Sequence, residues 1–586
     1  MINDRTKEEG HNYGSLSADN NHVERVNQVK KCNSDVGVNR MSVVSSREAV
    51  KSLNPMPVVH ICAILSSAFS YGCIMSTLFL LTLPVECVRF SNDGNSSLIL
   101  GLFAALAGLA QLVTPVVGKI SDIYHRQKQE EGINNDNTSS KRRQGRLPYV
   151  IVGSICMVLG IFGQFVFRGN DNVISDNSTM STIMLILYTC SFMMNMIGIN
   201  IVYCIMIALI PDLVPKEQTG LANGSLAFQL VIGSLFGFGI YNWMNSVAWM
   251  YFLYIFVTVS SAIFTYIIAH PREHFLQTQL IEHDSETSTL ISKHTIYDDY
   301  VDMNTGTNEM KKNLLKYLSI KGWIDELFIN PLRETSWKEI KEAFTIDKKV
   351  YHDFYIVTIS RLFYYMGVSS QTFFLYYIHD RIIAQQQQQQ PSNASQPNET
   401  SAMSMVSTLA ILAQIYGATT CIPVGILSDR YFHGRRKPFV YISCFLLAFS
   451  YISIVTTTTF HQMMICIMIG GAANGMYLTM DTSLAVDTLS TINDDDNDDG
   501  IVGHPQNSDM TGNAQLLGVW GVAGFLGTTL GPLVFGPVLF IFGHIPKSEH
   551  SFAHYKLNGY ILLYSISAIY FVISAYSLTF VRKRGV

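Results

Sequence analysis

Apolar residues in this chain are gathered into long blocks that polar loops separate. We count about twelve blocks of roughly 17 to 30 residues, and a helix of about 20 apolar residues is long enough to cross a bilayer. The pattern therefore predicts an all-α membrane protein with twelve transmembrane helices. The expected spans are 57–83, 98–117, 147–167, 182–210, 220–243, 247–269, 354–378, 403–427, 439–458, 462–486, 514–542 and 557–580.

The loop between the eighth and ninth spans sets the orientation of the others. It is short and carries four cations and one carboxylate, in the order Asp429, Arg430, Arg435, Arg436 and Lys437. Short loops rich in Lys and Arg remain in the cytosol. Because the number of spans is even, we expect both termini to be cytosolic, in a plasma or vacuolar membrane.

A similar pattern lies between the second and third spans. Gly118 and Asp122 follow the second span, as Gly425 and Asp429 follow the eighth, and Arg142, Arg143, Gly145, Arg146 and Pro148 precede the third. Two copies at matching positions predict two related six-helix halves, 57–269 and 351–581. The charges could latch a helix end at the cytosolic face, or they could serve only to set topology.

Polar segments flank and interrupt these halves. We expect 1–56 to be a disordered cytosolic tail, 582–586 a basic cytosolic terminus, and 270–350 a cytosolic linker with interfacial amphipathic helices. A protein-binding helix is the alternative for the linker. The insertions at 127–140, 385–390 and 494–499 are typical of disordered loops.

Composition narrows the function. Hydrophobic residues make up 48% of the chain and charged residues 14%, which is unlike a soluble protein, and the net charge of -4 gives no reason to expect nucleic acid as a partner. The ten cysteines have no paired spacing that would indicate a metal site or disulfides. We find no nucleophile with its base and no phosphate-binding glycine loop, so the sequence predicts neither an enzyme nor a cofactor.

The two basic loops resemble the signature loop of the major facilitator superfamily, which lies between the second and third helices of each half. Further segments are similar to the sucrose/proton symporters and the wider glycoside-pentoside-hexuronide carriers: Gln111 to Asp122, Gly145 to Tyr149, Ser360 to Phe363, Gly475 to Asp481, and Ala208 to Gly220. The resemblance implies a secondary transporter for a small polar solute, a sugar such as a disaccharide, coupled to protons.

Carriers built from two repeats hold their solute near the middle of the bilayer and expose it alternately to each side. Arg361 and Asp481 are ionisable residues inside predicted spans, at depths that would let them meet, so each needs a partner or a function. We expect them to pair, or one to hold solute while the other is its counter-charge. A purely structural pair is the alternative.

Neutral polar residues inside the spans are candidate solute ligands or, equally, contacts between helices. They include Gln111, Asn195, Asn200, Tyr203, Gln371 and Asn474. At the cytosolic ends of the spans, we expect charged residues to form a gate that latches one transport state. These are Asp122, Arg146, Asp212, Asp429, Arg430, Arg435, Arg436 and Asp487.

Other functions stay open at this point. A carrier of a non-sugar organic solute would use the same fold, and so would a transporter-like membrane sensor or scaffold without turnover. A channel is less consistent with the repeat, because two matching halves suit alternating access.

Overall fold

The computed structural model describes residues 56–91, 95–134, 146–168, 178–215, 218–291, 351–383, 399–432, 435–490, 509–545 and 555–582, with single residues at 327, 333, 346 and 348. Of the expected polar segments, the tail up to 55, most of the linker, the residues after 582 and the insertions at 385–390 and 494–499 lie outside these ranges. So does the first insertion beyond residue 134.

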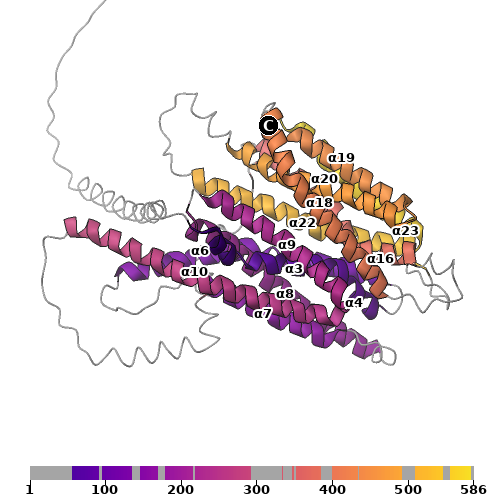
Figure 1. Ribbon diagram of the computed structural model, residues 1–586, viewed down its shortest axis with the longest axis horizontal. Helices are drawn as coiled ribbons and strands as arrows, with labels where there is room; N and C mark the ends of the chain where they lie inside the picture. The colour runs from indigo at the N-terminus through magenta and orange to yellow at the C-terminus, as the bar shows by residue number, and fades with distance from the viewer. Residues whose placement is uncertain are drawn as a thin grey trace, which may run out of the picture. The chain divides into compact units, whose positions relative to one another are not determined.

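The described part of the first half consists of helices (Figure 1). The first span is built from four consecutive segments, and each later span is one helix or two. The elements are α2 (Val58–Ile64), α3 (Ser67–Thr77), the π-helix η1 (Leu78–Thr82), α4 (Leu83–Phe90), α5 (Ser96–Ala110), α6 (Val113–Asn134), α7 (Leu147–Phe167), α8 (Ser178–Leu213), α9 (Thr219–Met244) and α10 (Val247–Ile291).

The second half follows the same plan. Its elements are α15 (His352–Val368), the 3₁₀ segment η4 (Ser369–Phe373), α16 (Phe374–Ile378), the π-helix η5 (His379–Ile383), α18 (Glu399–Tyr431), α19 (Lys437–Thr456), α20 (Phe460–Ser490), α22 (Asp509–Gly543), α23 (Leu557–Ser577) and η6 (Leu578–Phe580). Among the described residues, eleven helices are long and apolar enough to cross a membrane. The all-helical membrane fold is confirmed.

The seventh expected span, 354–378, which is not among these eleven, is not one continuous helix. It is divided by η4, where two hydroxyl groups bond to the backbone. Ser369 Oγ donates to the Met366 carbonyl at 2.7 Å, and Ser370 Oγ donates to the Gly367 carbonyl at 2.8 Å. Such local bonds offer the backbone an alternative to regular α-helix.

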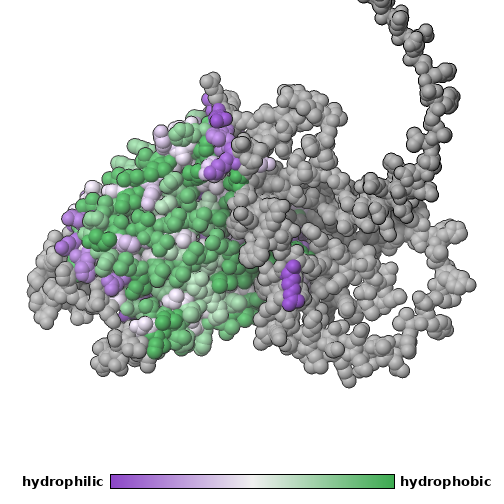
Figure 2. All heavy atoms as spheres, turned by 180° about the vertical axis from the view of Figure 1, so that it is seen from behind, coloured by the Kyte–Doolittle hydropathy of each residue, from purple (hydrophilic) through white to green (hydrophobic). Residues whose placement is uncertain are grey.

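The outside of the helical bundle is apolar. Large hydrophobic side chains such as Phe256, Phe264, Ile422, Phe445 and Ile541 are exposed on long helices. Figure 2 shows one face on which hydrophobic residues dominate and hydrophilic residues gather toward the edges. An exposed apolar surface of this extent fits contact with lipid rather than with water.

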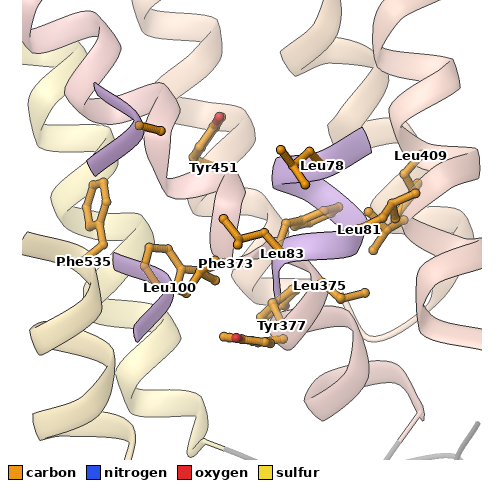
Figure 3. Packing of buried hydrophobic residues seen from close by; sticks show 14 of the residues in the cluster. Leu78, Leu81, Leu83, Leu100, Phe373, Leu375, Tyr377, Leu409, Tyr451 and Phe535 are labelled. Atoms are coloured by element: carbon orange, nitrogen blue, oxygen red, sulfur yellow. The ribbon is translucent and has the colours of Figure 1, made fainter. Parts of the chain in front are cut away.

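The two halves meet at one end of the bundle. We call the end with the Arg146 and Arg436 loops the basic-loop end and the opposite end the far end. At the far end, α5 packs on α22, and α9 packs on α18. Figure 3 shows buried side chains of both halves packed here, among them Leu78 and Leu100 from the first half with Phe373 and Leu375 from the second.

Hydrogen bonds between the halves lie at the same end of the bundle as these packing contacts. Those that join two described residues all lie at the far end: Ser96 and Ser97 with Tyr555, Ser97 with Gly536, Tyr376 with Pro84, Asn242 with Thr408 and Ser404, and Ser407 with Phe238. The described contacts therefore hold the bundle closed at the far end.

Candidate functional site

An ion pair inside the second half is the chemical centre of the candidate site. Arg361 of α15 donates through Nη1 to Asp481 Oδ2 of α20, and their side chains are only 13% and 3% exposed. The structure thus brings together the two ionisable residues that we singled out inside the spans. Burying two charges is costly, and their mutual attraction offsets that cost only when the pair is intact.

Aromatic rings surround the guanidinium group. The Arg361 Cζ atom lies 3.5 Å from the ring centroid of Trp520 and 4.8 Å from that of Tyr365, which are cation–π distances. Arg361 Nη2 also donates to the Tyr365 hydroxyl at 3.3 Å. These contacts hold the guanidinium in place.

Two donors of this cluster remain available. Arg361 Nε and Trp520 Nε1 are buried and have no hydrogen-bond partner among the described residues. Buried donors are normally paired with protein, water or ligand. The cluster therefore has donors for a solute that carries acceptor oxygens.

The first half faces this cluster with two tyrosines. Tyr71 of α3 stacks on Tyr203 of α8 with ring centroids 4.4 Å apart, and both are partly exposed. Tyr203 lies close enough to Tyr365 and Arg361 to interact electrostatically with both. The site therefore draws side chains from both halves, as alternating access requires.

Asn474 supports the pair from α20. Its Oδ1 accepts a hydrogen bond from the Tyr364 hydroxyl, and the Tyr364 ring stacks parallel to Tyr477 at a centroid distance of 3.4 Å. Tyr364 and Tyr477 are fully buried. This layer packs α15 on α20 directly beside Arg361 and Asp481.

The other predicted ligands lie elsewhere. Asn195 is fully buried, and its backbone packs against Gly160 of α7, while its side-chain amide has no hydrogen-bond partner among the described residues. Asn200 donates to the Met196 carbonyl of its own helix at 2.7 Å, which favours a packing role for Asn200. Gln111 is buried where the chain turns from α5 into α6, and Gln371 is exposed and donates to the Tyr451 hydroxyl at 2.8 Å.

Sequence reasoning missed Trp520 and Tyr365. The chain has 33 Phe, 29 Tyr and 5 Trp, so aromatic residues alone carry little information about a site. The spacing of Arg361 and Tyr365 by four residues, which places them on one helix face, is the signal that was present.

At the basic-loop end, Arg146 joins three elements of the first half. Its guanidinium lies 2.6 Å from Asp122 of α6 and 2.6 Å from Asp212 of α8, and its Nη1 donates to Ser121 Oγ at 2.9 Å. Burial alone would lower the pKa of Arg146, but Asp212 and Asp122 outweigh it, so that pKa is raised. Arg146 therefore stays charged.

The second half repeats this arrangement with Arg436. Its Nε lies 3.3 Å from Asp487 Oδ2 of α20, and its Nη1 donates to Ser428 Oγ at 2.9 Å. Asp487 and Arg436, both expected as gate residues, are thus ion-paired in the structure. Arg430 and Arg435 are exposed. The Asp429 side chain lies outside the described part of the chain.

The match between the halves is structural. Ser121, Arg146 and Asp212 correspond to Ser428, Arg436 and Asp487 in position and in contacts. Each arginine fastens the start of one helix to two others. Each latch lies within its own half, and its use as a gate between transport states stays a prediction.

Comparison with known proteins places the chain in a family. Residues 139–493 match the model of the Major Facilitator Superfamily, so the chain belongs to that family of secondary transporters and is not an enzyme. No curated protein sequence matches the chain significantly.

Solved structures of transporters share the fold. The structure of a D-xylose-proton symporter is similar over 90% of this chain and 98% of its own, with a TM-score of 0.51 and 12% sequence identity. The nucleoside transporter NupG is similar over 90% of this chain and 100% of its own, with a TM-score of 0.51 and 13% identity. At such identities the likeness concerns the fold alone.

Proposed function

We propose that this secondary transporter moves a small polar solute, a sugar such as a disaccharide, and that protons drive its movement. The observation that carries the proposal is the Arg361–Asp481 pair among aromatic rings, with tyrosines of the other half facing it. Sugar hydroxyls both donate and accept hydrogen bonds, and the apolar faces of sugar rings pack on aromatic side chains.

Asp481 is the proposed proton carrier. While it is ionised, it holds Arg361 through the salt bridge. When it takes up a proton, the attraction falls and Arg361 is free to bind acceptor oxygens of the solute. Solute binding and proton binding then favour each other, which is the requirement for symport.

The closed far end fits one state of the transport cycle. If the basic loops are cytosolic, as the positive-inside rule predicts, then a bundle held together at the far end is an inward-facing carrier. The solute would leave toward the cytosol from this state.

The test is uptake of labelled sucrose, maltose and glucose by proteoliposomes with and without an inward proton gradient. We expect accumulation that needs the gradient in the native protein and is lost in Asp481→Asn. A suitable control is Asp353→Asn, which makes the same change at the basic-loop end of α15 and should retain uptake.

Each part of the proposal has its own contrary result. Uptake that is the same with and without the proton gradient would overturn the proposed proton coupling. Absence of sugar uptake by folded protein would overturn the sugar assignment, and would favour a carrier of another organic solute or a sensor without turnover.

A further inference from the structure

Asp380 is another buried carboxylate, which lies at the far end and on a different helix from Asp481. Asp380 belongs to the π-helix η5 at the far end of the broken seventh span, and its side chain is 3% exposed. An ionisable group that is buried at a membrane interface needs partners or a function. Its partners lead directly to the contact between the halves.

Tyr555, Tyr560 and His379 are among the residues that contact the Asp380 carboxylate. The backbone N–H of Tyr555 donates to Oδ2 at 2.9 Å, the Tyr560 hydroxyl donates to the same oxygen at 2.6 Å, and His379 Nδ1 lies 3.0 Å from Oδ1. Hydrogen bonds to an ionised acceptor are roughly twice as strong as those between neutral groups. Ionised Asp380 therefore holds Tyr555 firmly.

Tyr555 in turn caps a helix of the other half. The Ser97 N–H in the first turn of α5 donates to the Tyr555 hydroxyl at 2.8 Å, and Ser96 Oγ lies 2.9 Å from the same oxygen. The residue before α5, Asn95, provides no side-chain cap of its own. The Ser97 N–H at the start of α5 thus has its acceptor, Tyr555, in the second half of the chain. Opening the far end must break this contact.

The chemistry of Tyr555 suits this role. Burial raises the pKa of the Tyr555 phenol, although the hydrogen bonds from Ser96 and Ser97 oppose the shift. The hydroxyl therefore stays protonated and can accept from Ser97 while it donates to Ser96. Carboxyl and imidazole groups in general exchange protons at lower pH than phenols do.

We propose that Asp380, together with His379, is a proton-binding site of the far-end gate, separate from Asp481, and that its ionised form keeps the far end closed by positioning Tyr555 on α5. A proton from the far-side solution would convert the carboxylate to the neutral acid. The bonds to Tyr555 and Tyr560 then weaken, and the far end opens more readily.

Other titratable groups pack around this site and contribute to its electrostatics. They are Arg381 on the same π-helix, Tyr376 one turn earlier, Tyr555 and Tyr560 at the start of the last span, His544, which forms a backbone bridge with Tyr555, and Cys87 of the first half, which interacts with Tyr376. The proposal does not depend on the solute or on Asp481, so its test needs no transport assay.

The test is hydrogen–deuterium exchange of the peptide covering 95–103, measured on the full chain in lipid nanodiscs from pH 7.5 to 4.5 and corrected for intrinsic rates. In the native protein, we expect corrected exchange to rise as the pH falls. In Asp380→Asn, which mimics the neutral acid, exchange should already be about tenfold faster at pH 7.5 and should not respond to pH.

Two further variants complete the test. Tyr555→Phe removes the capping hydroxyl and should speed exchange at 95–103 at every pH. Asp353→Asn is the matched control, because His352 and Asp353 form the same dipeptide at the other end of the same span, with Nδ1 and Oδ1 3.2 Å apart. Native-like protection in Asp380→Asn, or a flat pH profile in the native protein, would overturn the proposal.

Discussion

Arg146 and Arg436 hold matching places in the two halves, and each pairs with an aspartate near the end of a long helix. Arg146 lies 2.6 Å from Asp212, which is 25% exposed. Arg436 lies 3.3 Å from Asp487, which is 38% exposed. Solvent screens the Arg436–Asp487 pair more strongly, so we expect that pair to contribute less to stability than the Arg146–Asp212 pair.

The difference predicts unequal effects of the same substitution. Removing one partner of a buried pair costs about 3–5 kcal/mol, whereas an exposed pair contributes about 0.2–1 kcal/mol. For Arg146→Gln we expect a loss between these limits, about 1–3 kcal/mol, and for Arg436→Gln a smaller loss. Thermal unfolding of both purified variants, monitored by tryptophan fluorescence, shows which variant loses more stability. An equal or larger loss in Arg436→Gln would show that the contacts described for Arg146 do not control stability.

Among the elements, α5 and α22 make the tightest joint between the halves. A Cβ atom at Gly536 would lie 2.8 Å from the Ser97 carbonyl oxygen, and one at Gly101 would lie 2.7 Å from the Pro532 carbonyl oxygen. Backbone rather than flexible side chain fills the space at both positions. The two helices can approach this closely only because these residues have no side chain.

A side chain at this joint should therefore prevent closure. For Gly536→Val we expect faster hydrogen exchange at the start of α5, because the far end can no longer shut. Gly521→Val is the control on the same helix, since a Cβ at Gly521 meets nothing within 4 Å. Exchange in Gly536→Val that equals exchange in the control would mean that α5 and α22 do not form the closing contact.

At the scale of the whole molecule, alternating access requires the far end to open during each cycle. Ser404 Oγ of α18 lies 3.2 Å from Asn242 Oδ1 of α9, so the two helices are close enough at this point for a cross-link. In the double variant Asn242→Cys/Ser404→Cys, we expect an oxidant to form a disulfide that stops uptake in the liposome assay. A reductant should restore uptake, and each single variant should be insensitive to oxidant. Undiminished uptake by fully cross-linked protein would exclude opening at this place.

The sequence predicted the fold far better than the site. A long apolar block is nearly sufficient to predict a membrane helix. In lipid the backbone N–H and C=O groups must be hydrogen-bonded within the segment, and a helix achieves this. Arg361 and Asp481 were found for the same reason, since charges inside such blocks are rare. The breaks in the helices were harder to predict, and Ser369 and Ser370 in the seventh span carry no signal as strong as proline.

The contacts that depend on tertiary structure were out of reach. Trp520 and Tyr365 are ordinary aromatic residues until α15 and α22 bring them to Arg361. Asp380 and Tyr555 are separated by more than a hundred residues and lie at span ends, where polar residues are expected in any membrane protein. Only the packed bundle distinguishes them from interfacial residues.

The cap that Tyr555 places on α5 has a consequence for how the protein is made. The first half is synthesised and inserted well before residue 555 leaves the ribosome, and domains generally begin to fold in that order. Until then, the Ser97 amide lacks the oxygen that satisfies it in the finished molecule. A chain that stops before its last helix therefore leaves the Ser97 amide at the start of α5 without this acceptor.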